Sequence, residues 1–481
     1  MLIHSSPMLS FAYLVCGLGA SLRLVAASSE VIQRDVVVIG GGASGAYAAV
    51  RLRDDFNKSI ALIEKEARLG GMVDTYVDEK TGAIYDYGVD SFLNISNSMD
   101  FFARFNIPVT TNSTTSTATT EYFDFNTGKK VGFNAPSETI QIEAIAKFLK
   151  VIEPWESMLR PGYWNFPEPK NIPADFLITF GEFLTKYGVE KAAPLMYSTT
   201  GLGVGNMSEV ATMFALQAFG WDMARAMVGE MALYKPVSGG NQALYNAIEK
   251  GLGDDVFYSS TVIESSRSEH GVFLTVRNHK TGELTRIAAR RLLVAIEPSE
   301  SNMKPLDLSP SEWNTLSKFD FSNEYCGLVD NAAFNTSYLY SNLPSTAAPN
   351  HYLVFQDEPM VQSFEYSGLD HLFRVMIIGN KTTTAADAKV LAQDSFNTLL
   401  KSGRLSGSTQ SQELSWAAFA THGPMHARAS VEDVKAGFYQ DLYKLQGARS
   451  TWWTGGAFSV NFQTTLWEFD EGLFPKILEG I

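Results

Sequence analysis

The stretch from Val36 to Gly45, VVVIGGGASG, constrains the fold more than any other part of the sequence. Its apolar, β-branched beginning is typical of a buried parallel strand. The strand ends in a G-x-G-x-x-G pattern, and a run of helical composition follows at residues 46–53. Gly40 would permit a tight turn, Gly42 would let backbone approach a pyrophosphate, and Gly45 would let the helix lie close to the strand. The pattern therefore predicts a dinucleotide site at a helix N-terminus.

A second strand is expected at residues 59–63, and it ends on Glu64. An acid at this distance from the glycines suits hydrogen bonding to a ribose diol. The glycines alone would also fit a turn that binds no ligand, and Glu64 alone would fit a solvated strand end. The order of strand, glycines, helix, strand and acid favours the dinucleotide site.

Length and charge narrow the class of protein. A chain of 481 residues is too long for one simple core, so two domains are expected. Hydrophobic residues make up 45% and charged residues 19%, as in folded globular proteins. The formal net charge of -14 argues against nucleic acid and anionic membrane surfaces as partners.

The N-terminus resembles a cleavable signal peptide. Residues 8–20 are mostly apolar but too few for a stable membrane span, and small residues at Val25-Ala26-Ala27 would suit cleavage. A secreted or secretory-pathway protein is expected, with an uncleaved anchor or a disordered leader as the alternatives. Six glycosylation sequons fit that route, at Asn57, Asn94, Asn112, Asn206, Asn335 and Asn380. Cys16 lies in the leader, so the mature chain would keep only Cys326 and could form no internal disulfide.

The predicted fold class is α/β, with a discontinuous Rossmann-like domain and a second α+β substrate-binding domain. Helical periodicity predicts helices at 137–153, 176–187, 209–231 and 242–252, and strands are expected at 352–355 and 372–378. Short β-rich runs return between residues 256 and 296, so the chain is expected to leave the first sheet and re-enter it. The expected divisions are a signal peptide at 1–27, nucleotide-binding parts at 28–100, 233–300 and 437–481, and substrate-domain parts at 101–232 and 301–436.

Further motifs follow in a characteristic order. After Glu64 come Gly70-Gly71, Asp86-Tyr-Gly88, a turn at 236–241, a strand at 261–263, the strand end Ala295-Ile-Glu-Pro298 and the turn Thr454-Gly455-Gly456. Together they resemble the flavin amine oxidase superfamily, which implies a flavin amine oxidase-like fold and bound FAD. The resemblance assigns the cofactor contacts to Gly40, Gly42, Ala43, Ser44, Gly45, Glu64, Lys65, Arg68, Gly70, Gly71, Met72, Val262, Gly455 and Gly456.

NAD is the alternative cofactor, but Gly70-Gly71 and the C-terminal return favour the longer FAD. No cysteine or histidine stands out as an attachment point, so non-covalent FAD is expected. The stretches 437–447 (GFYQDLYKLQG) and 451–458 (TWWTGGAF) are similar to a fungal branch of β-cyclopiazonate dehydrogenase-like enzymes. That branch implies an oxidoreductase acting on a fungal metabolite.

The sequence departs from the superfamily pattern at three places. Met72 stands where many members have arginine after the Gly-Gly pair. The strand expected near residues 323–329 carries no lysine, whereas many members place there a lysine that is bridged by water to flavin N5. The acid often found after the C-terminal glycine is absent, since Ala457 and Phe458 follow Gly455-Gly456. Simple amine oxidation is thus less firmly implied than FAD binding.

The catalytic residues stay unknown at this point, with Trp452, Trp453 and His422 as candidates. By strand alternation one tryptophan would face the core and the other a substrate, or both would pack. His422 and His426 form a close pair without an evident third ligand, so no metal site is expected, and an acid or base role competes with an exposed loop. Cys326 would be a small buried side chain rather than a nucleophile. Asn461 and Phe462 would fall near a helix start, close to the flavin.

Three functions are compatible with these motifs. The first is an FAD oxidoreductase that oxidises or dehydrogenates a small, largely apolar, nitrogen-containing metabolite by hydride transfer, with O2 as acceptor. The second is a flavin-dependent isomerase, and the third is a non-catalytic FAD-binding protein. Release of hydrogen peroxide during turnover would separate the first from the second.

Overall fold

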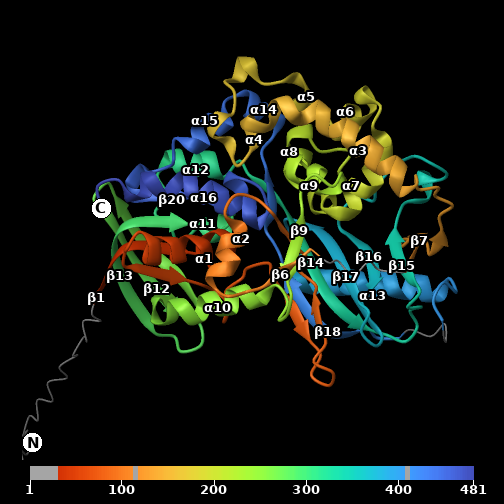
Figure 1. Ribbon diagram of the computed structural model, residues 1–481, viewed down its shortest axis with the longest axis horizontal. Coiled ribbons are helices and arrows are strands. Elements are labelled where there is room, and N and C mark those ends of the chain that lie inside the picture. Colours follow the sequence, from red (N-terminus) through yellow and green to blue (C-terminus); the bar gives the residue numbers. More distant parts are fainter. Residues whose placement is uncertain (1–30, 112–117, 407–411) are drawn as a thin grey trace, which may run out of the picture.

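A computed structural model describes residues 31–111, 118–406 and 412–481. Two large sheets form the framework, with the first at the left of Figure 1 and the second at the lower right. Short helices gather at the top of the view over the second sheet. The predicted signal peptide at 1–27 and the sequon asparagine Asn112 lie outside the described residues.

The first sheet has seven strands in the order β10-β2-β1-β13-β12-β11, with β20 also paired to β13. Five of them, β10, β2, β1, β13 and β20, run parallel, so their carboxyl ends meet at one edge. The β-branched run at the end of β1 is buried on both faces, as predicted from its composition. The bounds are β1 Val31–Ile39, β2 Ile60–Ile63, β10 Val256–Phe257, β11 Ser260–Ser268, β12 Gly271–Asn278, β13 Leu284–Val294 and β20 Thr451–Trp453.

The second sheet has eight strands in the order β18-β14-β17-β16-β15-β7-β8, with β19 also paired to β14. It is antiparallel except for the β15–β7 pair. Helix α13 (Ala385–Lys401) packs against β16 and β17. The bounds are β7 Thr119–Asp124, β8 Lys129–Lys130, β14 Asp320–Asp330, β15 Tyr338–Asn342, β16 Met360–Tyr366, β17 Leu372–Asn380, β18 Ser415–Thr421 and β19 Met425–Arg428.

Helices cover the two sheets differently. Helix α1 (Ala43–Val50) contacts both α10 (Gln242–Leu252) and α16 (Gln463–Leu478), and together they cover the first sheet. The helical layer at the top of Figure 1 comprises α3 Glu138–Ile152, α5 Ala174–Leu177, α6 Phe180–Tyr187, α7 Ala193–Thr199, α8 Thr212–Ala218 and α9 Trp221–Met227. Small strand pairs join the layers: β3 Thr75–Val77 with β4 Ile84–Asp86, and β9 Leu233–Pro236 with β5 Phe92–Leu93 and β6 Val109–Thr110.

Three sequence predictions of secondary structure were wrong. Residues 352–355 form no strand: the Val354 N–H donates to the His351 carbonyl in a turn, and Phe355 stacks on Tyr197. The helix expected at 176–187 is broken, because Thr179 begins α6 with a capping box to Glu182. The helix expected at 209–231 is split between α8 and α9 at Gly220. Aromatic and β-branched residues here serve packing rather than a strand ladder.

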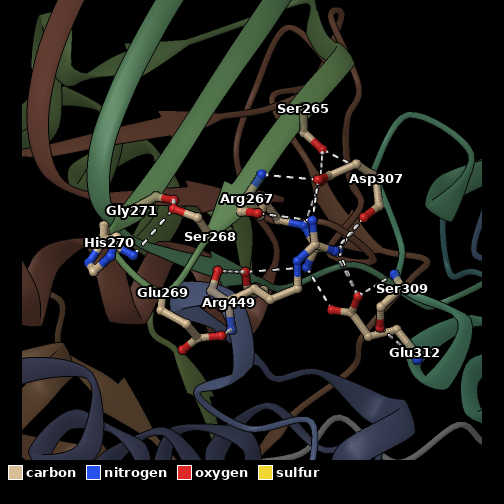
Figure 2. A network of polar contacts seen from close by, with 11 residues as sticks. Ser265, Arg267, Ser268, Glu269, His270, Gly271, Asp307, Ser309, Glu312 and Arg449 are labelled. Atoms are coloured by element: carbon tan, nitrogen blue, oxygen red, sulfur yellow. Dashed lines mark hydrogen bonds and ion pairs between the residues drawn. The ribbon is translucent and has the colours of Figure 1, made fainter.

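A buried ionic network fixes the approach to β20 (Figure 2). Arg267 on β11 has a fully buried side chain that pairs with Asp307 and with Glu312 of α12 (Pro310–Leu316). Arg449 binds the same two carboxylates from the segment just before β20. Four charges thereby tie three distant segments together just before the start of β20.

The sequon asparagines differ in exposure. Asn57, Asn94 and Asn335 are exposed, whereas Asn206 and Asn380 are partly buried. The Asn206 amide donates to Asp357 at 2.9 Å, and the Asn380 side-chain oxygen accepts hydrogen bonds from Thr382 and Thr383. Within the described residues, no helix is both long enough and apolar enough to cross a membrane.

Candidate functional site

The turn between β1 and α1 requires glycine at two of its positions. Gly40 has φ +99°, and a Cβ there would lie 2.6 Å from the Ala295 carbonyl oxygen. A Cβ at Gly45 would lie 1.7 Å from the Gly40 oxygen, so only glycine lets α1 pack this close to β1. At Gly42, a Cβ would meet only the Cα of Gly71 among the described atoms, at 3.6 Å. The surface over Gly42 is thus open to a ligand, as the predicted approach of a pyrophosphate requires.

Glu64 lies directly after β2 and faces this turn. One carboxylate oxygen accepts the Gly41 N–H at 2.6 Å and the other accepts the Glu66 N–H at 2.7 Å. The side chain is buried, and burial raises its pKa although both N–H groups oppose the shift. Each oxygen keeps a free lone pair, so the carboxylate can still receive ribose hydroxyls.

The other residues assigned to the adenosine side occupy different environments. Gly70 and Gly71 both have positive φ, and Gly71 packs against Gly42. The Arg68 guanidinium binds Asp74 and Gln242, which makes it a link between segments. Placement of the remaining assigned side chains varies: Lys65 is exposed, Met72 and Ala43 are partly buried, and Ser44 and Val262 are buried.

The C-terminal turn lies at the end of β20. Gly455 has φ +100°, and no described atom lies within 4 Å of a Cβ built there. Helix α16 follows at Gln463, next to Asn461 and Phe462, without a side-chain cap from the described residues. Trp452 and Trp453 are both buried in the core, Trp453 stacked on Phe458 and Trp452 beneath the Arg291 guanidinium. Neither indole is exposed, which agrees with the alternative that both tryptophans pack, and a substrate contact by one of them stays a prediction.

Several buried polar atoms at the carboxyl edge of the first sheet have no hydrogen-bond partner among the described residues. They are Ser44 Oγ in α1, Glu297 Oε2 after β13, and Gln463 Nε2, Thr464 Oγ1 and Asp470 Oδ2 in the first half of α16. The side chains of Ser44, Thr464 and Asp470 are buried, and those of Glu297 and Gln463 are partly buried. Burial raises the pKa of Asp470 well above its usual range. Native interiors rarely leave such groups unpaired, so this edge is built for a polar ligand. With the open glycine turns, it fits FAD.

A second polar cluster links the second sheet to Asp74, the residue just before β3. His422 Nε2 lies 2.7 Å from an Asp74 oxygen, and Cys326 Sγ lies 3.6 Å from both ring nitrogens. Burial lowers the pKa of His422, but Cys326, Asp74 and Glu324 outweigh it and raise the pKa to about 10. His422 is therefore a buried cation at neutral pH. The sequence indicated only the histidine pair, because Asp74 and Cys326 are distant in the chain.

His426 differs from His422 although only three residues separate them. Burial and the positive charge of Arg428 lower its pKa to about 3, so the ring stays neutral. Its Nδ1 lies 3.3 Å from the Asn461 amide nitrogen. The two histidines therefore form no shared site.

Asp74, Cys326 and His422 place three ligand-type atoms within 4.8 Å of one another. The sequence predicted no metal because the pair His422 and His426 had no evident third ligand, whereas the fold brings two other residues, Asp74 and Cys326, to His422. Arg68 binds the other Asp74 oxygen, however, and its positive charge opposes a cation there. The absence of a metal therefore stays a prediction.

Strand β14 occupies the place where many amine oxidases carry lysine. It bears Glu324 and Cys326, two residues apart and so on one face. Burial raises the pKa of the Glu324 carboxyl, while His422 and Arg374 oppose the shift. His422 and Arg374 are therefore positively charged neighbours of Glu324 on this strand.

Comparison with known proteins agrees with this geometry. The sequence profile of the NAD(P)-binding Rossmann-like domain matches residues 38–105. The FAD-dependent oxidoreductase pigF of Monascus ruber is 30% identical over 456 residues, covering 94% of this chain and 93% of that protein. The β-cyclopiazonate dehydrogenase of Aspergillus flavus is 30% identical, covering 93% of this chain and 94% of that protein.

Solved structures show the same fold. A fatty acid isomerase from P. acnes that produces CLA superimposes with a TM-score of 0.69 at 16% identity, covering 92% of this chain and 99% of that one. Putrescine oxidase with bound putrescine gives a TM-score of 0.60 at 15% identity, covering 93% and 98%. The chain thus shares its fold with putrescine oxidase and with the fatty acid isomerase. The chain belongs to the FAD-dependent oxidoreductase family that includes β-cyclopiazonate dehydrogenase.

Proposed function

We propose that this protein binds FAD non-covalently and dehydrogenates or oxidises a small, largely apolar, nitrogen-containing fungal secondary metabolite. The observation that carries the proposal is the carboxyl edge of the first sheet. It combines Glu64, open glycine turns at Gly42 and Gly455, and buried polar atoms that lack partners among the described residues. Relatives in this family are named as FAD-dependent oxidoreductases. Bound FAD would accept a hydride at N5, and O2 would then take up the two electrons as hydrogen peroxide.

His422 is the cation that we assign to the reaction centre. Asp74 follows Gly71 by three residues, and a Cβ at Gly88 would lie 3.1 Å from His422 Cε1. The imidazolium therefore lies beside the segment that leads away from the Gly70-Gly71 turn. A fixed positive charge in a buried site stabilises the negative charge that a hydride brings. Asp74 orients the ring and keeps it protonated.

The purified protein tests this proposal directly. It should be yellow, and denaturation should release FAD without leaving flavin on the precipitate. Anaerobic mixing with a panel of fungal nitrogenous metabolites should bleach the flavin for the true substrate, and air should then restore the colour with release of hydrogen peroxide. A colourless protein that cannot be reconstituted with FAD would refute the proposal. Rearrangement of the substrate without peroxide would instead support an isomerase.

We also propose that the protein enters the secretory pathway. The support is the short apolar leader with Val25-Ala26-Ala27, together with the exposed sequons at Asn57, Asn94 and Asn335. Expression in a eukaryotic secretory host should give a mature chain that begins near Ser28 and carries glycans. An unglycosylated cytosolic chain that still begins at Met1 would contradict this.

A further inference from the structure

Glu297 is a buried carboxyl group in an unusual position. It follows β13 by three residues and replaces the first proline of the Ala-x-Pro-Pro strand end that the superfamily carries. Its Oε2 is buried without a partner among the described residues. Its Oε1 lies 2.7 Å from where a Cβ at Gly456 would be, and the N–H groups of Gly456 and Ala457 hydrogen-bond to the carboxyl. Leaving a buried carboxyl oxygen without a hydrogen bond costs folding free energy, so such an oxygen indicates a position where a bound ligand could supply the missing partner.

The strand order determines which part of FAD would reach Glu297. The parallel strands lie in the order β2-β1-β13-β20. Glu64, which would hold the adenosine ribose, follows β2, and the glycine turn for the pyrophosphate follows β1. The other half of the dinucleotide must therefore cross the ends of β13 and β20, where Glu297 and Gly456 lie. Directly beyond the pyrophosphate, that half is the ribityl chain, a row of hydroxyl groups.

We propose that Glu297 is a cofactor-binding residue whose carboxyl group holds the ribityl hydroxyls of FAD. This rests on the proposed function as an FAD enzyme. Asn461 Oδ1 and Glu297 Oε1 lie 2.0 and 2.7 Å from where a Cβ at Gly456 would be, so the two side chains together fill the space beside the C-terminal glycine turn. A neutral carboxyl offers one O–H donor and a carbonyl acceptor, which together match a diol.

The protonation of Glu297 makes this binding pH-dependent. Burial raises its pKa to about 8, while the N–H groups of Gly456 and Ala457 oppose the shift. Tyr163 faces the carboxyl, with Tyr439 and Tyr443 behind it, and burial raises the pKa of all three phenols, which stay neutral. Residues 40–45 and 455–458 carry no titratable side chain. Above pH 8 the carboxylate would lose its donor and repel the pyrophosphate, so FAD affinity should fall.

Two ligands and two variants separate the contribution of Glu297 to binding the flavin half of FAD from the binding of the ADP half. Apoprotein would be titrated with FAD, followed by flavin fluorescence, and with ADP, followed by calorimetry, at pH 6.5 and 9. Glu297→Ala should weaken FAD about 10- to 100-fold at pH 6.5, the loss expected for hydrogen bonds to a buried group, and leave ADP affinity unchanged. Glu297→Gln keeps a donor and an acceptor, so it should bind FAD within about 3-fold of wild type and lose the pH dependence.

The outcomes distinguish this proposal from the proposed function. If wild type binds no FAD, the proposed function itself fails. If wild type binds FAD and folded Glu297→Ala binds it equally well, only the role of Glu297 is overturned. Should Glu297→Ala fail to fold, Glu297→Gln decides, because a pH dependence as steep as in wild type would assign the titration to another group and overturn the proposal.

Discussion

Two polar clusters beside the first sheet differ in how completely their atoms are paired. Around Arg267, the guanidinium nitrogens bind Asp307 and Glu312, and Arg449 binds the same carboxylates (Figure 2). At the carboxyl edge of the first sheet, Glu297, Ser44 and Asp470 each keep a buried atom that lacks a partner among the described residues. The Arg267 cluster is the more exposed of the two, since the side chains of Asp307 and Arg449 are 33% and 24% exposed whereas Asp470 is fully buried. Its charges are nevertheless the ones that are paired.

This difference distinguishes a cluster that stabilises the fold from a cluster that is suited to binding a ligand. A buried ion pair stabilises a fold only when its partners offset the cost of removing charge from water. The Arg267 cluster meets that condition, and hydrogen bonds to Arg267 help hold the pKa of Glu312 below its usual range against the effect of burial. The edge cluster does not meet it, and burial raises the pKa of Glu297 and Asp470. Incomplete pairing in an otherwise well-packed domain indicates that a ligand completes it.

Gly42→Val should have the largest effect on the edge. The backbone at Gly42 has φ -74°, which valine tolerates, and the space above it is open. The apoprotein should stay folded, while the branched side chain occupies the position of the pyrophosphate and weakens FAD more than about 100-fold. Gly132→Val is the matched control, because a Cβ there meets no described atom within 4 Å and the position lies outside the glycine turn. If Gly42→Val bound FAD with wild-type affinity, the pyrophosphate of FAD could not lie over this turn.

Arg267→Met should have the largest effect on stability. It leaves Asp307 and Glu312 with fewer cations in a buried site, at a cost of about 3–5 kcal/mol. Chemical denaturation of the apoprotein measures this loss. Lys444→Met removes an exposed pair with Asp441 and should change stability by less than about 0.5 kcal/mol. An equally stable Arg267→Met would show that the paired cluster contributes nothing, and the contrast with the edge would disappear.

Glu64→Gln should weaken the adenosine half of the site. The amide cannot accept both backbone N–H bonds and ribose hydroxyls, and the loss of a charged acceptor costs about 1.5–3 kcal/mol. Affinities for FAD and for ADP should therefore fall together, by about 10- to 150-fold in titrations of the apoprotein. A loss for FAD without one for ADP would place Glu64 on the flavin side and reverse the assigned direction of the dinucleotide.

His422→Gln should lower the flavin reduction potential by about 30 mV, equivalent to about 1.4 kcal/mol for two electrons. His426→Gln is the control, because that imidazole is neutral and its removal changes no charge. The raised pKa also predicts a pH effect on folding: the stabilisation by protonated His422 is complete below pH 6.5 and is lost as pH rises through about 10. If His422→Gln left both the flavin reduction potential and the pH dependence of unfolding unchanged, His422 would not be a cation beside the flavin.

Local patterns predicted the parts of the site that are close in sequence. The glycine turn and Glu64 follow consecutive strands, so their order was sufficient to anticipate their meeting. Asp74 and Cys326 join His422 only because strands from distant segments pair, and no short pattern contains that information. Glu297 was visible as an acid in place of a proline, but its burial depends on the turn at Gly456. The prediction followed apolar periodicity at 176–187 and missed the helix break at the capping residue Thr179.

Lys65→Met should have the smallest effect on FAD affinity. It tests whether an exposed charge close to the carboxyl edge of the first sheet contributes to FAD binding. Lys65 was predicted to contact FAD, and its side chain is exposed beside Glu64. Its charge lowers the pKa of Glu64 only as a minor contribution compared with burial. Solvent screens an exposed charge, so FAD affinity should change by less than about 3-fold and the change should vanish near 1 M salt. A salt-independent loss as large as that of Glu64→Gln would mean that Lys65 closes over the bound cofactor, and the edge would then be completed by an exposed side chain as well as by the ligand.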